Sequence, residues 1–144
     1  MFRIAVIGGG IGGLFAALSI HHHCKSSDIQ IDVYEQATEY TEIGAGVGIG
    51  ANAAALMAKL GLTEDMLKIG GHMDDIWLTF RRYDNGGEVH TIMNPANTKI
   101  PHISMHRAEF IDLLVRAVKR QGAATLHTNR SEEHTSELQS PCNL

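Results

Sequence analysis

The sequence has few cysteines and no dense cluster of basic residues. Only two of its 144 residues are cysteine, Cys24 and Cys142, and they lie far apart without metal-ligand spacing. This scarcity argues against a disulfide framework and a zinc site, and it favours a reducing, cytoplasmic compartment. The formal net charge is −4, and the adjacent basic pairs are Arg81-Arg82 and Lys119-Arg120. A nucleic-acid or anionic-membrane surface needs concentrated positive charge, so we expect a small-molecule partner instead.

One stretch of the chain, residues 4–20, carries no charge at all. Hydropathy alone would suggest a signal peptide or a membrane span. Glycines, however, occupy positions 8, 9, 10, 12 and 13, and each one would lower the helix propensity of a span. No small-residue cleavage site follows the stretch. We therefore expect no membrane segment here.

The first 35 residues have the pattern of a strand, turn, helix and second strand. Phe2–Ile7 is a short apolar run that glycine ends, and it predicts a fully buried parallel strand. Residues 11–23 predict a helix, and residues 30–35, with Ile31 and Val33 at period two, predict the second strand. A crossover helix makes such a pair of strands parallel.

Hydrophobic periodicity and turn residues predict the remaining elements. They are a helix over Asn52–Leu60, a short helix capped by Thr63, antiparallel strands over Ile76–Tyr83 and Glu88–Met93, a loop over Pro95–Pro101, a helix over Ala108–Gln121 and a strand over Ala123–His127. The turn between the antiparallel strands, Asp84-Asn85-Gly86-Gly87, tolerates positive φ. Trp77 and Phe80 are interpreted as packing residues, with contact to the substrate as the alternative. The predicted fold is α/β, with a Rossmann-like βαβ unit in a parallel sheet and an added antiparallel hairpin.

Three glycines in the first turn carry the chemistry of dinucleotide binding. Gly8, Gly10 and Gly13 form a G-x-G-x-x-G pattern that follows a strand and opens a helix. The first glycine lets the chain turn sharply, the second lets backbone amides approach a pyrophosphate, and the third lets the helix pack closely on the strand. The phosphates would face the helix N-terminus, where unpaired N–H groups favour negative charge.

Glu35 lies at the end of the second predicted strand, 22 residues beyond Gly13. A carboxylate at this place accepts hydrogen bonds from both hydroxyls of an adenosine ribose, and it repels a 2′-phosphate. The pattern therefore predicts FAD or NAD rather than NADP.

Three segments of the sequence resemble one family. IAVIGGGIGGLFAALSI, VYEQ and EIGAGVGIGANAAALMAKLGL are similar to flavoprotein monooxygenases of the salicylate hydroxylase and para-hydroxybenzoate hydroxylase group, and the likeness covers roughly Met1 to Gln121. The resemblance implies FAD as the cofactor. In that family the segment matching Gly44–Gly50 lies along the flavin, which would place Gly46, Val47 and Gly48 there. The alternative for this segment is a glycine-rich edge strand.

A second match is the segment from Ser104 to Phe110, which resembles the family's histidine–arginine motif at the start of a long helix. The resemblance implies that Arg107 contacts the ribityl–phosphate region of FAD, whereas a surface salt bridge is the alternative. It also implies the family reaction, in which NADH or NADPH reduces the flavin and oxygen then hydroxylates an aromatic or similar substrate. No catalytic residue can be assigned. His21-His22-His23 predict no metal site, because consecutive helical positions point in different directions.

The end of the chain departs from the pattern. Residues 130–140, RSEEHTSELQS, resemble the in-frame translation of a sequencing-library adapter, although a natural disordered terminus is the alternative. We therefore expect residues 1–129 to be the N-terminal part of an FAD-binding monooxygenase domain and residues 130–144 to be a non-native tail. The family's later Asp-Gly and Gly-Asp motifs do not follow Gly122, so the fragment itself is expected to be inactive. Another FAD- or NAD-dependent dehydrogenase or oxidase, or a non-catalytic dinucleotide-binding module, stays an alternative.

Overall fold

The computed structural model describes residues 2–24, 28–40, 45–71, 76–93 and 102–131 of the chain. The chain divides into two compact units. The first contains Met1–Ile43 and Phe110–Leu144, and the second contains Gly44–Glu109. The first unit has a parallel sheet, and the second has two antiparallel strand pairs.

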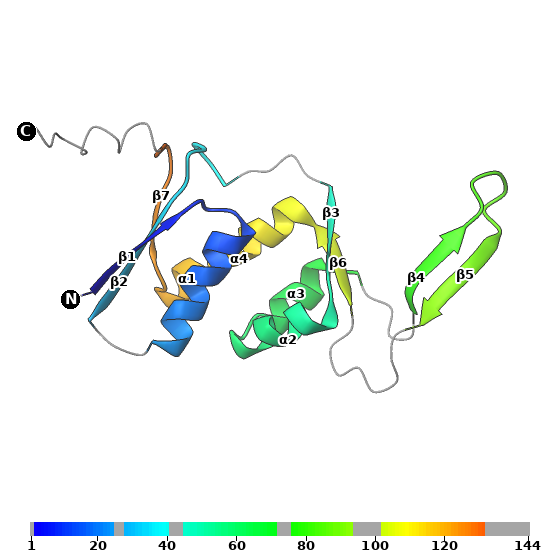
Figure 1. Cartoon of the computed structure of the whole chain (residues 1–144), viewed down its shortest axis with the longest axis horizontal. Coiled ribbons are helices and arrows are strands. Elements are labelled where there is room, and N and C mark those ends of the chain that lie inside the picture. The colour runs from blue at the N-terminus through cyan, green and yellow to red at the C-terminus, as the bar shows by residue number, and fades with distance from the viewer. Residues whose placement is uncertain (1, 25–27, 41–44, 72–75, 94–101, 132–144) are drawn as a thin grey trace, which may run out of the picture. The chain divides into compact units, whose positions relative to one another are not determined.

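The sheet of the first unit is three-stranded and parallel. Its strands are β1 (Phe2–Ile7), β2 (Ile29–Tyr34) and β7 (Thr125–His127), in the order β1-β2-β7 (Figure 1). The helix α1 (Ile11–His23) connects β1 to β2. These elements confirm the predicted βαβ unit and the predicted parallel strand near residue 125.

The two faces of this sheet differ in chemistry. On one face Ala17 of α1 packs with Ile31 and Val33 of β2, all three buried. The other face carries a polar cluster around Asp32, which is only 5% exposed. Asp32 accepts hydrogen bonds from Gln30 Nε2 at 3.1 Å and pairs with His127 Nε2 at 2.9 Å, and Arg3 lies at 3.4 Å.

The prediction that β1 is fully buried is wrong. Phe2 is 66% exposed and Ile7 is 64% exposed. Within its sheet β1 pairs only with β2, so it is an edge strand. An apolar run typical of a central parallel strand therefore lies at the edge of the described sheet.

The long predicted helix is confirmed as α4 (Arg107–Gln121), whose apolar face is buried at Phe110, Ile111, Leu113, Leu114, Val115, Ala117 and Val118. Gly122 follows it with φ of +62°, in the left-handed region that glycine adopts without strain. The chain then enters β7, the strand that extends the parallel sheet on the far side of β2 from β1.

In the second unit α2 (Ala51–Lys59) and α3 (Thr63–Ile69) confirm the two short predicted helices. The predicted capping role of Thr63 is wrong, because Thr63 is already the first helical residue and Leu62 precedes it in a helical backbone conformation. The reason is packing: Leu62 is fully buried, which commits this position to the interior.

The predicted hairpin is present as β4 (Ile76–Arg81) and β5 (Glu88–Met93), an antiparallel pair (Figure 1). β4 ends two residues earlier than predicted, because the N–H of Arg82 already bonds to the Gly87 carbonyl across the turn. Trp77 and Phe80 are each 50% exposed, so their interpretation as packing residues is wrong. A two-stranded ribbon cannot enclose side chains by itself. The predicted loop over Pro95–Pro101 lies outside the described residues.

Candidate functional site

The turn after β1 has the backbone geometry that the glycine motif requires. Gly8 has φ of +99°, a region that residues with a side chain rarely adopt. Its N–H donates to the Tyr34 carbonyl at 2.8 Å, which continues the pairing of β1 with β2. A Cβ added at Gly13 would overlap the carbonyl oxygen of Gly8, so the third glycine allows the helix to pack directly on the turn.

Gly10 is the residue before α1, and it faces open space. A Cβ at this position would meet nothing within 4 Å, and no side chain caps the helix there. The first turn of α1 contains no acidic residue. The N-terminal amides of a helix have no partner within the helix, and their partial positive charge attracts anions. This turn thus offers an accessible anion-binding surface on backbone atoms.

The carboxylate of Glu35 lies beside this turn. Its Oε2 accepts the Gly9 N–H at 2.7 Å, and its Oε1 accepts the Ala37 N–H at 2.9 Å. Each carboxylate oxygen can accept more than one hydrogen bond. The two amides therefore fix the orientation of the group and leave each oxygen able to accept a ligand hydroxyl.

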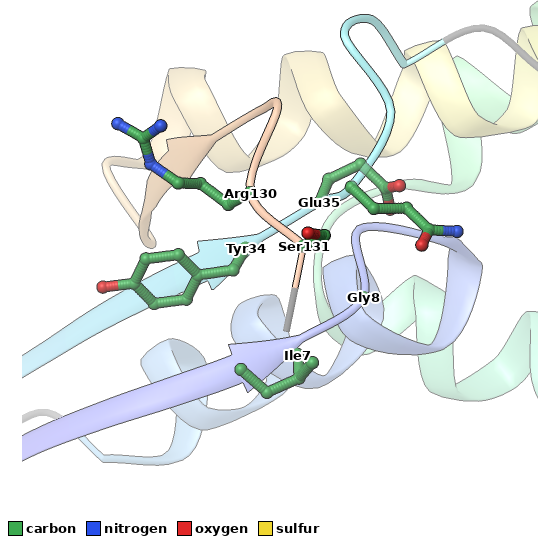
Figure 2. A pocket seen from close by; sticks show the side chains of 7 residues that line it. Ile7, Gly8, Tyr34, Glu35, Arg130 and Ser131 are labelled. Carbon is green, nitrogen blue, oxygen red and sulfur yellow. The ribbon is translucent and has the colours of Figure 1, made fainter. Parts of the chain in front are cut away.

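A cavity of about 550 Å³ adjoins Gly8 and Glu35 at the carboxyl ends of β1 and β2. Figure 2 shows that its lining comes from three neighbouring segments: the end of β1, the end of β2 and the chain after β7. The lining residues are Ile7, Gly8, Tyr34, Glu35 and Gln36, together with Arg130 and Ser131 of the segment that is expected to be non-native. Ligands of open α/β sheets bind at this end of the strands.

The remaining predicted site residues gather in the second unit. The strand β3 (Gly46–Ile49) pairs antiparallel with β6 (Ile103–His106), which runs directly into α4. Gly46 lies opposite His106, and the N–H of Arg107 donates to the Ala45 carbonyl at 3.3 Å. The structure therefore brings Gly46, Val47, Gly48 and Arg107 into one cluster.

The ribbon of β3 and β6 has one apolar face and one face almost without side chains on β3. Ile49, Ile103 and Met105 are buried on the apolar face, where Val47 also lies. Gly46 and Gly48 are exposed on the other face. A planar group could approach the backbone closely at Gly46, whereas the His102 ring lies beside Gly48 on this face.

His102 is a residue whose position sequence reasoning missed. Its Nδ1 accepts the indole N–H of Trp77 at 3.2 Å, and a Cβ at Gly48 would meet its Nε2 at 2.8 Å. It also lines a cavity of about 600 Å³ with Trp77 and Ser104. A signal was present: residues 102, 104 and 106 alternate with the apolar Ile103 and Met105, but the strand β6 itself was not predicted.

Among the described residues no group of three or more His, Cys, Asp and Glu side chains could hold a metal ion. Within the same residues no helix is long and apolar enough to cross a membrane. His21, His22 and His23 occupy the last turn of α1, as expected. The predicted site residues described above form one cluster in each of the two units.

Comparison with known proteins identifies the relatives of this chain, although no family model matches it. Salicylate hydroxylase from Pseudomonas putida is 36% identical over 117 residues, which cover 78% of this chain and 26% of that enzyme. 3-Hydroxybenzoate 6-hydroxylase 1 from Aquipseudomonas alcaligenes is 32% identical over 134 residues, covering 88% of this chain and 32% of the relative. The homologues are FAD-dependent aromatic monooxygenases.

Solved structures of flavin monooxygenases share the fold. p-Nitrophenol 4-monooxygenase from Pseudomonas putida matches with a TM-score of 0.73 at 19% identity, covering 90% of this chain and 33% of that one. CtdE in complex with FAD matches with a TM-score of 0.65 at 19% identity, covering 91% and 30%. The family resemblance and the α/β fold class are therefore confirmed. The chain spans about 26% of the length of salicylate hydroxylase.

Proposed function

We propose that this chain binds FAD and forms the N-terminal, adenosine-binding part of a flavin-dependent monooxygenase. The whole protein would hydroxylate an aromatic or similar small molecule with NAD(P)H and oxygen. The observation that carries the proposal is the Glu35 carboxylate, held by two backbone amides beside the Gly8–Gly10 turn. The homology to aromatic monooxygenases supports the reaction type.

Each residue of the first cluster has a part in this proposal. The open side of Gly10 and the first amides of α1 would hold the pyrophosphate, which needs donors and positive potential. Glu35 would accept hydrogen bonds from the two ribose hydroxyls. Gly8 and Gly13 would bind nothing directly, and they keep the turn tight enough for the amides to face the ligand.

The second cluster would hold the reactive end of the cofactor. Gly46, Val47 and Gly48 would lie along the flavin, where Gly46 permits close approach and the His102 ring beside Gly48 would have to move aside. Arg107, at the junction of β6 and α4, would contact the ribityl–phosphate region with its positive charge. FAD supplies the redox chemistry, and the described residues supply binding and orientation.

We also propose that residues 1–129 are the native part of the chain and that residues 130–144 are a non-native tail. The resemblance of residues 130–140 to the translation of a sequencing-library adapter supports this. Genomic sequence across codon 129 tests the proposal: a coding sequence that continues into further monooxygenase motifs is expected, whereas a genomic stop after Leu144 contradicts it.

The free, exposed thiol of Cys24 supports a cytoplasmic location.

Expression of the full-length gene product tests the proposed reaction. We expect a yellow protein that oxidises NADH or NADPH faster when a hydroxylated aromatic acid is added, with a hydroxylated product and oxygen uptake. A flavin-loaded protein that oxidises a substrate without inserting oxygen would instead indicate a dehydrogenase or oxidase. A well-folded protein that takes up no flavin would contradict the cofactor assignment.

A further inference from the structure

Gly9 is not part of the G-x-G-x-x-G pattern, yet the structure leaves no room for a side chain there. A Cβ at Gly9 would meet Tyr40 Cε1 at 2.5 Å and Glu35 Cβ at 2.9 Å. The ring of Tyr40 therefore occupies the space beside the Gly9 backbone. By contrast, Gly8, Gly10 and Gly12 each have open space at the same position.

The amide of Gly9 is one of the two groups that fix Glu35. Its N–H donates to Oε2 at 2.7 Å, and the other oxygen is held by the Ala37 amide at 2.9 Å. All of these residues line one small cavity of about 150 Å³ together with Gly10 and Tyr40. The direction of the Gly9 peptide decides whether this first hydrogen bond forms, and the Tyr40 ring lies against that peptide.

The hydroxyl of Tyr40 makes no stabilising contact with the described residues, so the part of Tyr40 that supports Gly9 is its ring. Its hydroxyl is buried and has no hydrogen-bond partner among the described residues. Burial and the negative charge of Glu35 raise the pKa of the Tyr40 phenol, so the hydroxyl is neutral. A buried unpaired hydroxyl is destabilising. Phenylalanine would fill the same space without this cost.

We propose that Tyr40 is a positioning residue of the nucleotide site: its ring holds the Gly9 amide against Glu35 and so directs the carboxylate toward the ribose. The inference rests on the proposed function, because it concerns how Glu35 recognises ribose hydroxyls. Tyr40 acts through Gly9 and Glu35 and does not itself contact the ligand. Its ring is the active part, and its hydroxyl contributes nothing to binding.

The test compares ADP, which represents the adenosine half of FAD, with 2′-deoxy-ADP on the whole chain. Calorimetry should show that the wild-type chain prefers ADP by about tenfold, because a hydrogen bond to a charged group is lost with the deoxy ligand. In Tyr40→Ala the ratio of the dissociation constant of 2′-deoxy-ADP to that of ADP should fall toward one. If Tyr40 had a purely structural role, Tyr40→Ala would weaken the binding of both ligands equally and leave the ratio unchanged. That result would overturn the inference.

Two further variants complete the design. Tyr40→Phe keeps the ring, so it should keep the wild-type ratio and raise the melting temperature because the unpaired hydroxyl is removed. A Tyr40→Phe chain that loses the ratio would overturn the inference, since the hydroxyl would then act on the ligand. Tyr83→Ala, at a fully exposed tyrosine in the hairpin turn, is the control and should change neither quantity.

The same measurements separate this inference from the proposed function. A folded wild-type chain that binds neither ADP nor FAD contradicts the proposed function. A wild-type chain that prefers ADP, together with a Tyr40→Ala chain that keeps the preference, contradicts only the role of Tyr40. In the Glu35→Gln background, Tyr40→Ala should change the ratio no further, because both substitutions affect the same carboxylate.

Discussion

Glu35 shows how a single side chain can be oriented before a ligand arrives. Both of its oxygens accept hydrogen bonds from backbone amides, so in the proposed site the carboxylate would lose little further freedom when ribose hydroxyls bind. Glutamine at this position would offer only one acceptor oxygen and would turn its NH₂ group toward a backbone donor. The charge and one of the two fixed contacts would both be lost.

We therefore expect Glu35→Gln to weaken ADP binding by about 1–3 kcal/mol, as for a hydrogen bond to a charged group. Isothermal calorimetry on the chain measures this directly. Glu39→Gln is the matched control, because Glu39 is exposed and lines the same small cavity. Equal losses in both variants would contradict a specific role of Glu35 in binding the ligand.

The surroundings of Asp32 lead to a second prediction, which concerns how the free energy of unfolding depends on pH. The hydrogen bond from His127 is the main cause that lowers the pKa of Asp32 below 3.8, and Arg3 adds to it while burial opposes it. A carboxyl group whose folded pKa is lowered stabilises the fold above its unfolded pKa. This contribution is fully present above pH 3.8 and is lost as the pH falls through the lower, folded value.

Asp32→Asn should accordingly lower the free energy of unfolding by about 1–3 kcal/mol at neutral pH, and the difference from wild type should shrink below pH 3.8. Arg3 contributes little of this, because its side chain is 66% exposed. Urea titrations at several pH values measure the difference. Asp112→Asn, which removes an exposed pair with Arg116 on α4, should cost only about 0.3–0.5 kcal/mol.

At the scale of elements, α1 offers a matched pair of adjacent glycines. Gly12 has open space around a Cβ, whereas a Cβ at Gly13 would overlap the Gly8 backbone. Gly12→Ala should keep or raise the melting temperature, because alanine favours a helix over glycine by up to about 1 kcal/mol. Gly13→Ala should lower it, because backbone atoms of the turn must move. Thermal unfolding followed by circular dichroism decides this, and equal effects would contradict the packing role of Gly13.

The β3–β6 ribbon offers a second pair of glycines for the same comparison. A Cβ at Gly48 would meet His102 Nε2 at 2.8 Å, whereas one at Gly46 would lie 3.7 Å from the Met105 carbonyl. Gly48→Ala should therefore displace the His102 ring and break its hydrogen bond with Trp77. Trp77 is the only tryptophan, so its fluorescence reports this change. Gly46→Ala should leave the emission and its quenching by acrylamide unchanged, and a similar response in both variants would count against this contact.

The elements differ in how well the sequence predicts them. β1, α1 and α4 follow from local patterns, because glycines and a regular apolar face mark their bounds. The strand β6 was missed because Ile103–His106 is short and pairs with the glycine-rich β3, whose sequence gives little strand signal. The hydrogen bond of Trp77 with His102 joins residues that are 25 positions apart, and the contact of Tyr40 with Gly9 depends on the folded loop. Neither contact has a local sequence pattern.

The whole chain combines a βαβ unit with apolar side chains that lie exposed on its surface. β1 is an edge strand, and apolar side chains such as Phe2, Ile7 and Val89 are more than 60% exposed. The chain also spans only 26% of the length of salicylate hydroxylase. In the proposed function, binding of the adenosine half of FAD depends on residues of the first unit, so it is the part of that function which this chain can test.

Titration of the purified, folded chain with FAD and with NAD⁺ tests the central claim most directly. The proposed site predicts saturable FAD binding, seen as a change in flavin fluorescence, and weaker binding of NAD⁺, which shares only the adenosine diphosphate half of the ligand. ADP should compete with FAD, and Glu35→Gln should weaken both. A folded chain that binds NAD⁺ and not FAD would contradict the account.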